Sequence, residues 1–369
     1  MLLLTDIKKL SNSDLTNLSN SLFGLPRPLS ENLKNINHTE YQAIRLLKVK
    51  NSMDLCQLLD MRFETVTSLI NQPIYKTYAI PKKKGGVRQI QAPDGLLKKA
   101  QKKLNFHLQH YYLYLKPDQS HGFVLNPNHK GDQCNIVSNA RPHVNKKQVL
   151  NLDLKNFFPS IKAKRIYDLF ASPLFEFDHR MATALTLLTT YESKLPTGAP
   201  TSPVLSNFVC LLMDQQLQEY AAANQMEYTR YADDLTFSSN ERIRTDHLKA
   251  IRQIIENADF TLNDKKARLR ASNSQQVVTG IMVNKKVNME RKLYKKIRAM
   301  LHDYQTNGLD KATQKHYGLK ESEICIFRNK FHNELAGYMS LIKQVRGKQD
   351  RLYQEFLLTI KKPDMRSLE

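Results

Sequence analysis

Apolar residues recur at helical spacing in the first part of the chain. Between residues 52 and 70 they return at intervals of one, three and four positions, which is typical of amphipathic helices. These positions are Leu55, Leu58, Leu59, Phe63, Val66, Leu69 and Ile70. We therefore predict a helical region over residues 1–75. A helix-turn-helix DNA reader would show a similar pattern, but we favour a helical pair that packs on the neighbouring part of the fold.

The middle of the chain, residues 149–285, alternates between strand-like and helix-like segments. Residues 149–154 form an apolar run that predicts a strand ending near Asp153. The run 229–239, TRYADDLTFSS, places β-branched and aromatic residues on both sides of two aspartates. It predicts two short strands joined by a tight turn, with Asp233 and Asp234 at the tip. Adjacent strand residues point to opposite faces, so these two aspartates need not share one role.

From residue 287 onward the pattern is mainly helical and basic. An apolar stripe is formed by Leu293, Ile297, Met300, Leu301 and Tyr304. The run 285–301, KKVNMERKLYKKIRAML, carries Lys285, Lys286, Arg291, Lys292, Lys295, Lys296 and Arg298. One face of such a helix can pack while the other follows a phosphate backbone, although a charged face that is merely solvated is the alternative. With no internal repeat, we expect one continuous unit with an α/β (α+β) fold.

Composition and charge indicate the class of partner. The chain has 369 residues, enough to bury a large core, and a net charge of +21 with a pI near 9.7. Such an excess favours polyanionic partners. An acidic membrane surface is the rival, but no Trp-anchored amphipathic helix supports it, and no apolar run approaches transmembrane length. The first four residues, MLLL, are too short for a secretory apolar segment.

The cysteines argue against a zinc or thiol-redox site. Cys56, Cys134, Cys210 and Cys325 lie far apart, and no C-x-x-C pair is present. We expect reduced cysteines in a cytoplasmic protein.

Carboxylates on two predicted strands indicate metal chemistry. One aspartate from each strand, Asp153 and Asp233, would make a hard oxygen site suited to Mg²⁺. Two such ions can clamp the attacking and leaving oxygens of a phosphoryl transfer. The alternative is that the Asp-Asp pair is only a turn signal.

The order of further motifs along the chain resembles that of reverse transcriptases. The matching blocks are DLKNFFPSI at 153–161, PTGAPTSP at 196–203, YADD at 231–234, LNDKK at 262–266 and VTGIMVN at 278–284. They lie within about residues 75 to 345. The chain departs from the family at Thr197, where most members carry Gln.

Two elements narrow the resemblance to retron reverse transcriptases. Residues 139–143, NARPH, are similar to the Asn-Ala-x-x-His element of that family, and residues 278–280 match its Val-Thr-Gly element. The resemblance implies RNA binding at Asn139, His143, Val278, Thr279 and Gly280. For His143, bracing of the structure is the alternative.

The resemblance implies a right-hand polymerase with fingers, palm and helical thumb. We expect an N-terminal helical region at 1–75, fingers at 76–148, a palm with catalytic hairpin and primer grip at 149–285, and a basic thumb with a tail at 286–369. A thumb helix would place Lys292, Lys295 and Lys296 on the RNA-containing duplex, which is read mainly by shape and backbone.

The resemblance also assigns catalytic and metal-binding residues. Asp153 and Asp233 would share two Mg²⁺ ions, the backbone carbonyl of Leu154 would add an oxygen, and Asp234 would be a weaker participant. Lys266, with Lys265 as the alternative, would protonate or neutralise the leaving pyrophosphate. A solvated charge pair is the rival interpretation of the two lysines.

Further residues are expected around the incoming dNTP. Phe158 would select deoxynucleotides by clashing with a 2′-hydroxyl, and Phe157 would be its core or backbone-positioning neighbour, although a register shift of one residue would exchange them. A core phenylalanine is the alternative for Phe158. Gly198 would permit close backbone approach to a ligand.

Basic and turn residues complete this expected set. Arg88 and Lys84, with Lys82 and Lys83 as alternatives to Lys84, would clamp the triphosphate from the arms of a Gly-Gly turn. A solvated basic loop is the other interpretation. The run 121–123 would line the nucleotide or template path, or form a turn with a core Phe. Ser202 is expected to cap the helix that follows.

Together these features predict a retron RNA-directed DNA polymerase. By resemblance, it would copy one structured noncoding RNA from an internal guanosine 2′-hydroxyl, giving branched RNA–DNA (msDNA), and act with an effector protein in antiphage defence. The alternatives are a group II intron-like reverse transcriptase and a non-catalytic RNA-binding scaffold. No membrane partner is expected.

Overall fold

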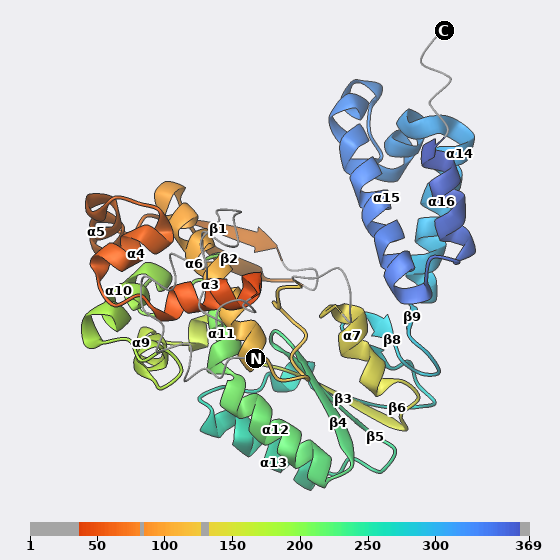
Figure 1. The fold of residues 1–369 in the computed structure, drawn as a ribbon. Helices are drawn as coiled ribbons and strands as arrows, with labels where there is room; N and C mark the ends of the chain where they lie inside the picture. Colours follow the sequence, from red (N-terminus) through yellow and green to blue (C-terminus); the bar gives the residue numbers. More distant parts are fainter. Residues whose placement is uncertain (1–36, 82–84, 127–132, 362–369) are drawn as a thin grey trace. The chain divides into compact units, whose positions relative to one another are not determined.

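A computed structural model describes residues 37–81, 85–126 and 133–361 (Figure 1). The described chain divides into two compact units. The first unit comprises the described residues of 1–134, 151–237 and 243–268. The second unit comprises 135–150, 238–242 and the described residues of 269–369. Each unit is described by itself.

The first unit begins with short capped helices. They are α3 (His38–Leu47), α4 (Ser52–Leu59) and α5 (Phe63–Asn71). The side chain of Asn37 accepts from the backbone N–H of Glu40, and Asn51 caps α4 in the same way through Met53 and Asp54. Helices α3 and α4 pack on the long helix α6 (Gly95–Leu115), and α5 contacts α10 (His179–Thr189). The helices predicted between residues 52 and 70 are thus confirmed, while residues 1–36 of the predicted helical region lie outside the described residues.

A β-hairpin lies between α5 and α6 in the chain. Strands β1 (Tyr75–Pro81) and β2 (Val87–Pro93) pair antiparallel, with Ile80 opposite Arg88. Gly85 and Gly86 both have positive φ, 88° and 82°, which the absence of a β-carbon permits. The turn predicted at these glycines is confirmed. The three lysines that precede it, Lys82 to Lys84, lie outside the described residues.

A four-stranded sheet carries the predicted aspartates. Its order is β4-β5-β3-β6, formed by β4 (Met226–Tyr231), β5 (Asp234–Ser239), β3 (Gln148–Asp153) and β6 (Arg268–Ala271). Helix α12 (Leu211–Ala223) packs on β4 and on α13 (Thr245–Asn257), and these helices lie along the sheet in Figure 1. Both strands of the predicted TRYADDLTFSS hairpin are therefore confirmed.

Further helices build the core of the first unit. They are α8 (Phe157–Ser160), α9 (Ala163–Ala171), α10 and α11 (Ser202–Val209). Helix α11 contacts α6 and α9. Aromatic rings of Tyr111, Phe175 and Phe208 meet there, with centroids 5.1–5.6 Å apart. This packing anchors α11, which precedes the hairpin in the chain, to the rest of the unit.

The second unit combines a small sheet with a helical bundle. Helix α7 (Ile136–Ala140) and the short turn η2 (Arg141–His143) precede β3. Strands β7 (Val277–Val278), β8 (Ile281–Met282) and β9 (Asn288–Met289) form the sheet. Helices α14 (Arg291–Tyr317), α15 (Ile324–Arg346) and α16 (Arg351–Lys361) follow. Gly308 interrupts α14 with φ 76° and ψ 172°.

The apolar stripe of α14 lies in the core of this bundle, as predicted. Ile297, Met300 and Leu301 are buried among residues of α15 and α16, and Leu293 and Tyr304 pack against the same cluster. The α/β (α+β) class predicted from the sequence is confirmed. Among the described helices, none combines the length and the apolar character needed to cross a lipid bilayer. All four cysteines are free thiols.

Candidate active site

The structure brings the predicted aspartates together at one point of the central sheet. Strand β3 ends at Asp153 and lies beside β5, which begins at Asp234. The backbone N–H of Leu154 donates to the carbonyl oxygen of Asp233 over 3.0 Å, which ties the end of β3 to the hairpin turn. Ala232 adopts a left-handed conformation with φ 58° in that turn. The local sequence predicts each strand, and the sheet pairing makes them neighbours.

The three carboxylates act on one another electrostatically. Burial, together with the charges of Asp233 and Asp153, raises the pKa of Asp234 to about 6. Burial also raises the pKa of Asp233, to which the charge of Asp153 contributes, while Lys266 and Arg88 act in the opposite direction. Clustered carboxylates of this kind gain from a bound cation, and their oxygens suit a hard divalent ion. The donor set of Asp153, Asp233 and Asp234 therefore fits Mg²⁺ chemically.

Asp153 is engaged by two polar neighbours. Lys266 Nζ donates to Asp153 Oδ1 at 2.6 Å, and Asn263 Nδ2 donates to Asp153 Oδ2 at 3.2 Å. Lys266 ends the short turn η3 (Asp264–Lys266), which the Asn263 N–H holds against the Asp153 carbonyl. The described residues contain no group of three or more His, Cys, Asp or Glu side chains arranged to hold a metal. The Mg²⁺ site thus stays a prediction.

The two phenylalanines after Asp153 have different surroundings. Phe157 is buried, and its ring lies 5.6 Å from that of Phe260. Phe158 is half-buried, and its ring lies 5.9 Å from that of Phe123 and 5.4 Å from that of Phe157. These positions support Phe157 as the core residue and leave Phe158 as the candidate for sugar contact, which stays a prediction.

The structure shows contacts for two residues of the 196–203 block, and the approach of Gly198 to a ligand stays a prediction. A β-carbon added to Gly198 would lie 2.8 Å from Ile90 Cγ2 and 2.9 Å from the Gln91 oxygen, so the close approach seen at this glycine is to strand β2. Ser202 does not cap α11, which was the prediction. It is the first residue of that helix, and its hydroxyl donates to the Pro196 oxygen at 2.7 Å. The N-cap position is Thr201.

The elements typical of retron enzymes form a buried network in the second unit. Asn139, His143 and Val278 are fully buried. Asn139 Nδ2 donates to Thr279 Oγ1 at 3.4 Å, and Thr279 Oγ1 donates to the Ile136 oxygen at 3.2 Å. His143 Nδ1 lies 2.7 Å from Ser238 Oγ. This burial favours the bracing alternative for His143, so any effect of these buried side chains on RNA would act through the backbone that they hold.

That network holds an unusual turn. Thr279 has φ 46° and Gly280 has φ 83°, and Gly280 is exposed at the tip between β7 and β8. A positive φ is rare for a β-branched residue, so the Thr279 hydrogen bonds stabilise a strained conformation. The exposed part of the element is therefore its backbone turn.

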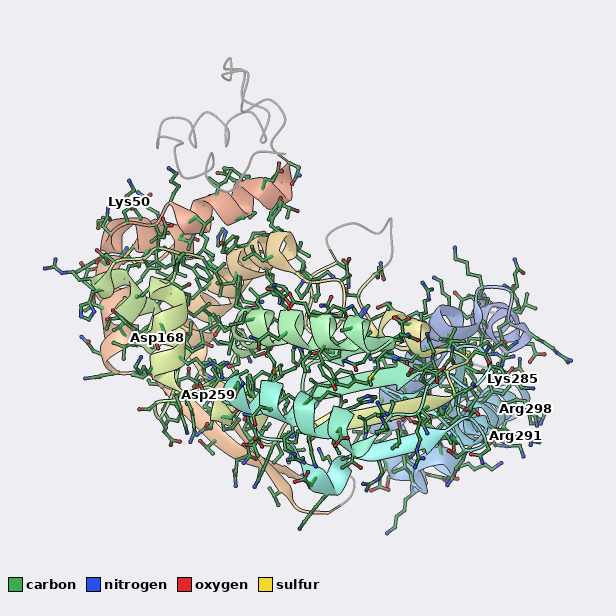
Figure 2. All side chains as sticks on the ribbon, turned by 90° about the horizontal axis from the view of Figure 1, so that it is seen from below. Lys50, Asp168, Asp259, Lys285, Arg291 and Arg298 are labelled. Atoms are coloured by element: carbon green, nitrogen blue, oxygen red, sulfur yellow. The ribbon has the colours of Figure 1, made fainter. Side chains whose placement is uncertain are left out.

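The basic residues of α14 separate into two groups. Lys292 and Lys295 are exposed, and Figure 2 shows Arg291 and Arg298 projecting from the same part of the second unit as Lys285. Lys296 is exposed as well, but it donates to Glu334 Oε1 and to the Tyr338 hydroxyl, each at 3.3 Å. Lys296 thus also links α14 to α15.

Sequence reasoning missed a buried ion pair beside the hairpin. Arg230, three positions before Asp233, and Asp214 of α12 have no exposed side-chain surface. Their nitrogen and oxygen atoms approach to 2.6 Å. A charged residue inside a strand of otherwise β-typical residues was the available signal.

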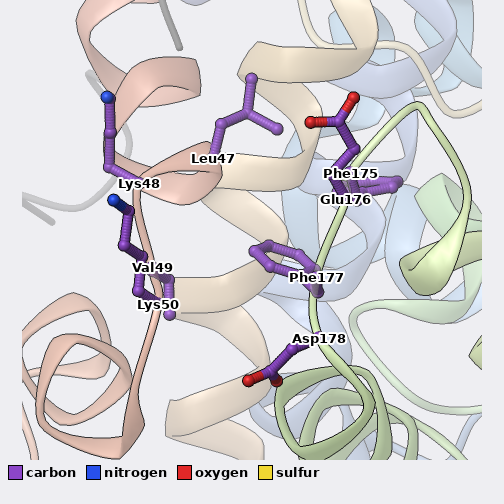
Figure 3. Close-up of a pocket in the computed structure, with 8 residues that line it drawn as sticks. All are labelled: Leu47, Lys48, Val49, Lys50, Phe175, Glu176, Phe177 and Asp178. Atoms are coloured by element: carbon purple, nitrogen blue, oxygen red, sulfur yellow. The ribbon is translucent and has the colours of Figure 1, made fainter. Parts of the chain in front are cut away.

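A hollow elsewhere on the first unit is the other candidate for a functional site. It measures about 360 Å³ and is lined by residues 47–50 and 175–178 (Figure 3). Lys48 and Lys50 stand on one side, and Glu176 and Asp178 on the other. It shares no residue with the aspartate cluster, so that cluster is the stronger candidate.

Comparison with known proteins assigns the chain to a family. Residues 80–317 match the family described as "Reverse transcriptase (RNA-dependent DNA polymerase)". This match confirms the fold class predicted from the sequence. A solved structure of telomerase from Candida albicans, in complex with a fragment of telomeric RNA, has a TM-score of 0.43 and 10% identity over 79% of this chain and 64% of that chain.

Two curated relatives share the retron designation. The retron Mx65 reverse transcriptase of Myxococcus xanthus is 35% identical over 62% of this chain, and the match spans 55% of that relative. The chain thus matches little more than half the length of this relative. The retron Ec73 reverse transcriptase of Escherichia coli is 30% identical over 73% of this chain and 83% of that protein.

Proposed function

This chain belongs to the retron reverse transcriptases, and from that premise we propose that it polymerises DNA on an RNA template. The observation that carries the proposal is the meeting of Asp153 with the Asp233–Asp234 turn through the Leu154 hydrogen bond. The charge of Asp153 raises the pKa of both Asp233 and Asp234, and carboxylates clustered in this way would favour bound cations, which nucleotidyl transfer requires. An RNA-binding scaffold without activity would have no need of such a cluster.

The metal site would be held by this cluster. Asp153 and Asp233 would hold two Mg²⁺ ions, the Leu154 carbonyl would add an oxygen, and Asp234 would be a weaker participant. When bound, such ions neutralise phosphate charge and orient the reacting oxygens. The contribution of the protein is to place these carboxylates in advance, because positioning and charge stabilisation provide most of the catalysis in phosphoryl transfer.

Other side chains would bind and orient the dNTP. Arg88 influences the pKa of Asp233, which puts its charge within electrostatic range of the carboxylates and suits it to a triphosphate. Phe158 would stand against the sugar. Lys266 would neutralise or protonate the leaving pyrophosphate, starting from its contact with Asp153. Lys84 would add a second triphosphate contact.

The RNA would be held by the second unit. We assign the backbone turn at Thr279 and Gly280, which Asn139 braces, to the recognition of a structured RNA, with His143 holding the neighbouring Ser238. Lys292, Lys295 and Lys296 would contact the backbone of the RNA-containing duplex. By family analogy, synthesis would start at an internal guanosine 2′-hydroxyl and give branched RNA–DNA, in a cytoplasmic defence system with an effector protein.

The experiment supplies purified protein with dNTPs, Mg²⁺ and the RNA encoded next to its gene. We expect DNA linked to RNA through a 2′-branch. Asp233→Asn should lose at least about a hundredfold in rate while still binding RNA. Asp168→Asn, which changes an exposed aspartate paired with Lys164, is the matched control and should retain activity. Normal extension by Asp233→Asn would refute the polymerase assignment, whereas extension of annealed primers without any branched product would refute only the retron-specific part.

A further inference from the structure

A buried ion pair lies directly behind the catalytic hairpin. Arg230 Nε donates to Asp214 Oδ1 at 2.8 Å, and Arg230 Nη2 donates to Asp214 Oδ2 at 2.6 Å, a two-pronged contact. Neither side chain is exposed, and the Tyr228 hydroxyl also donates to Asp214 Oδ1 at 2.8 Å. Burial of two charges costs much of what their attraction returns, so such a pair is weak evidence for a stabilising role.

The remaining donors of Arg230 reach three other segments. Nη1 donates to Asn207 Oδ1 at 2.9 Å and to the Ala232 carbonyl oxygen at 3.2 Å. Nη2 donates to Ser120 Oγ at 3.3 Å. The guanidinium therefore connects α12, α11 and the segment before Gly122 to the turn of the hairpin. A fork of fixed geometry can define the position of a carbonyl, which a mobile lysine would not do.

The segment around Gly122 contacts the hairpin turn on the side opposite the Arg230 guanidinium. The backbone of Arg230 exchanges hydrogen bonds with this segment, from Arg230 N to the Gln119 oxygen at 2.8 Å and from His121 N to the Arg230 oxygen at 2.9 Å. Asn207 Nδ2 donates to the Gly122 oxygen at 3.0 Å. A β-carbon at Gly122 would lie only 2.4 Å from Ala232 N. The turn is thus enclosed between Gly122 and the Arg230 guanidinium.

We propose that Arg230, anchored by Asp214, is a positioning residue that holds the Ala232 carbonyl and so fixes the turn presenting Asp233 and Asp234. The turn needs such support because Ala232 is left-handed, a conformation that an L residue with a side chain disfavours. The hydrogen bonds of Arg230 hold this conformation from the buried side. The proposal rests on the proposed polymerase function.

The test separates positioning from folding. In Arg230→Met with Asp214→Leu, both charges are replaced together by apolar side chains, an exchange that often leaves the stability of a protein with a buried ion pair unchanged. We expect this double variant to fold with a Tm near that of the wild type, yet to lose about a hundredfold in kcat for dNTP addition on a primed RNA template, with the KM for dNTP changed less than about threefold. Wild-type kcat in the folded double variant would overturn the proposal.

A second variant covers the case in which the double variant does not fold. Asn207→Ala leaves the ion pair intact but removes the link between Arg230 and the Gly122 backbone. It should lower kcat about tenfold at unchanged dNTP KM, and unchanged kcat would overturn the proposal. Leu185→Ala, at a buried position of α10, is the control for lost stability. At assay temperatures below its own Tm, it should retain the kcat of the wild type. Activity of the wild type, together with its loss in Asp233→Asn, shows independently that the polymerase assignment stands.

Discussion

Lys266 and Asp153 form an ion pair across the candidate active site, with Nζ 2.6 Å from Oδ1. The Asp153 side chain is 9% exposed and that of Lys266 is 59% exposed, so the lysine approaches a buried carboxylate from solvent. A cation at this position screens the charge that Asp153 exerts on Asp233 and Asp234. Because the lysine is exposed, it can leave Asp153 and reach a phosphate without disturbing the core.

Substitution of Lys266 should therefore impair catalysis more than folding. We expect Lys266→Met to lower kcat by about 10²-fold, in the range typical of general acid catalysis, with little change in dNTP KM. The measurement is single-turnover dNTP addition. Lys265→Met, the same change at the exposed neighbour, is the matched control. A larger loss for Lys265→Met than for Lys266→Met would show that the two roles are exchanged.

The two adjacent phenylalanines should respond differently to truncation. Phe158→Ala is expected to retain folding and to lower the ratio of kcat/KM for dNTP over rNTP by tenfold or more, since its half-buried ring would no longer meet a 2′-hydroxyl. Phe157→Ala is expected to lose about 3 kcal/mol or more of stability, because its ring is buried against Phe260. Urea unfolding and competition between the two nucleotides measure these effects. An unchanged nucleotide ratio in Phe158→Ala would make it a packing residue only.

Gly122 should tolerate no side chain. Its φ is not in the left-handed region, so the difficulty is the contact of 2.4 Å between an added β-carbon and Ala232 N. Since backbone must move, Gly122→Ala should displace the hairpin and lower kcat at least about a hundredfold. Gly337→Ala is the matched control, since an added β-carbon there meets nothing within 4 Å and alanine favours the helix by about 0.5–1 kcal/mol. Full activity of Gly122→Ala would contradict the enclosure of the turn.

The buried retron elements should matter more for branching than for extension. Replacing both Asn139 and His143 by Ala frees the Thr279 turn and the Ser238 contact. We expect branched product on the cognate RNA to fall at least about tenfold more than extension of an annealed primer, since selecting one 2′-hydroxyl requires a fixed RNA pose. Parallel assays of the two substrates, with thermal unfolding of each protein, make the comparison. Equal losses on both substrates would assign these residues to fold stability.

The free energy of unfolding should decrease at acidic pH because His107 becomes protonated. Burial lowers the pKa of His107 to about 4, from an ordinary value of 6.5. His107 therefore binds a proton more strongly in the unfolded chain than in the folded protein. Its contribution to the free energy of unfolding is full above pH 6.5 and is lost as the pH falls from about 6.5 toward 4. Between pH 7 and 5 this amounts to about 2 kcal/mol in the free energy of unfolding.

The check on that prediction is urea unfolding at both pH values for the wild type and His107→Gln. The amide can keep a hydrogen bond to the Gln42 carbonyl oxygen, which the His107 ring nitrogen meets at 3.2 Å, without titrating. His121, whose pKa burial also lowers to about 4, continues to titrate in the variant. An identical loss in both proteins would show that His107 does not drive the acid sensitivity.

Local periodicity in the sequence determined which segments form helices and strands. The stripe from Leu293 to Tyr304 repeats at helical spacing, and it packs in the core of the bundle. The residues around Asp233 and Asp234 are strand formers interrupted at one point, and they form a hairpin. Family motifs then predicted that Asp153 belongs with them. These features could be anticipated because each depends on residues that are close together in the chain.

Only the tertiary structure decided which distant groups meet. Arg230 and Asp214 lie on different elements, and nothing in the local pattern links the arginine to Asn207, Ser120 and the Ala232 carbonyl. The same holds for Gly198, whose missing side chain admits strand β2. It also holds for Asn139, for which the family resemblance implied RNA contact and which the fold buries. Burial and long-range hydrogen bonds arise from how elements pack, and a single sequence specifies them only through that packing.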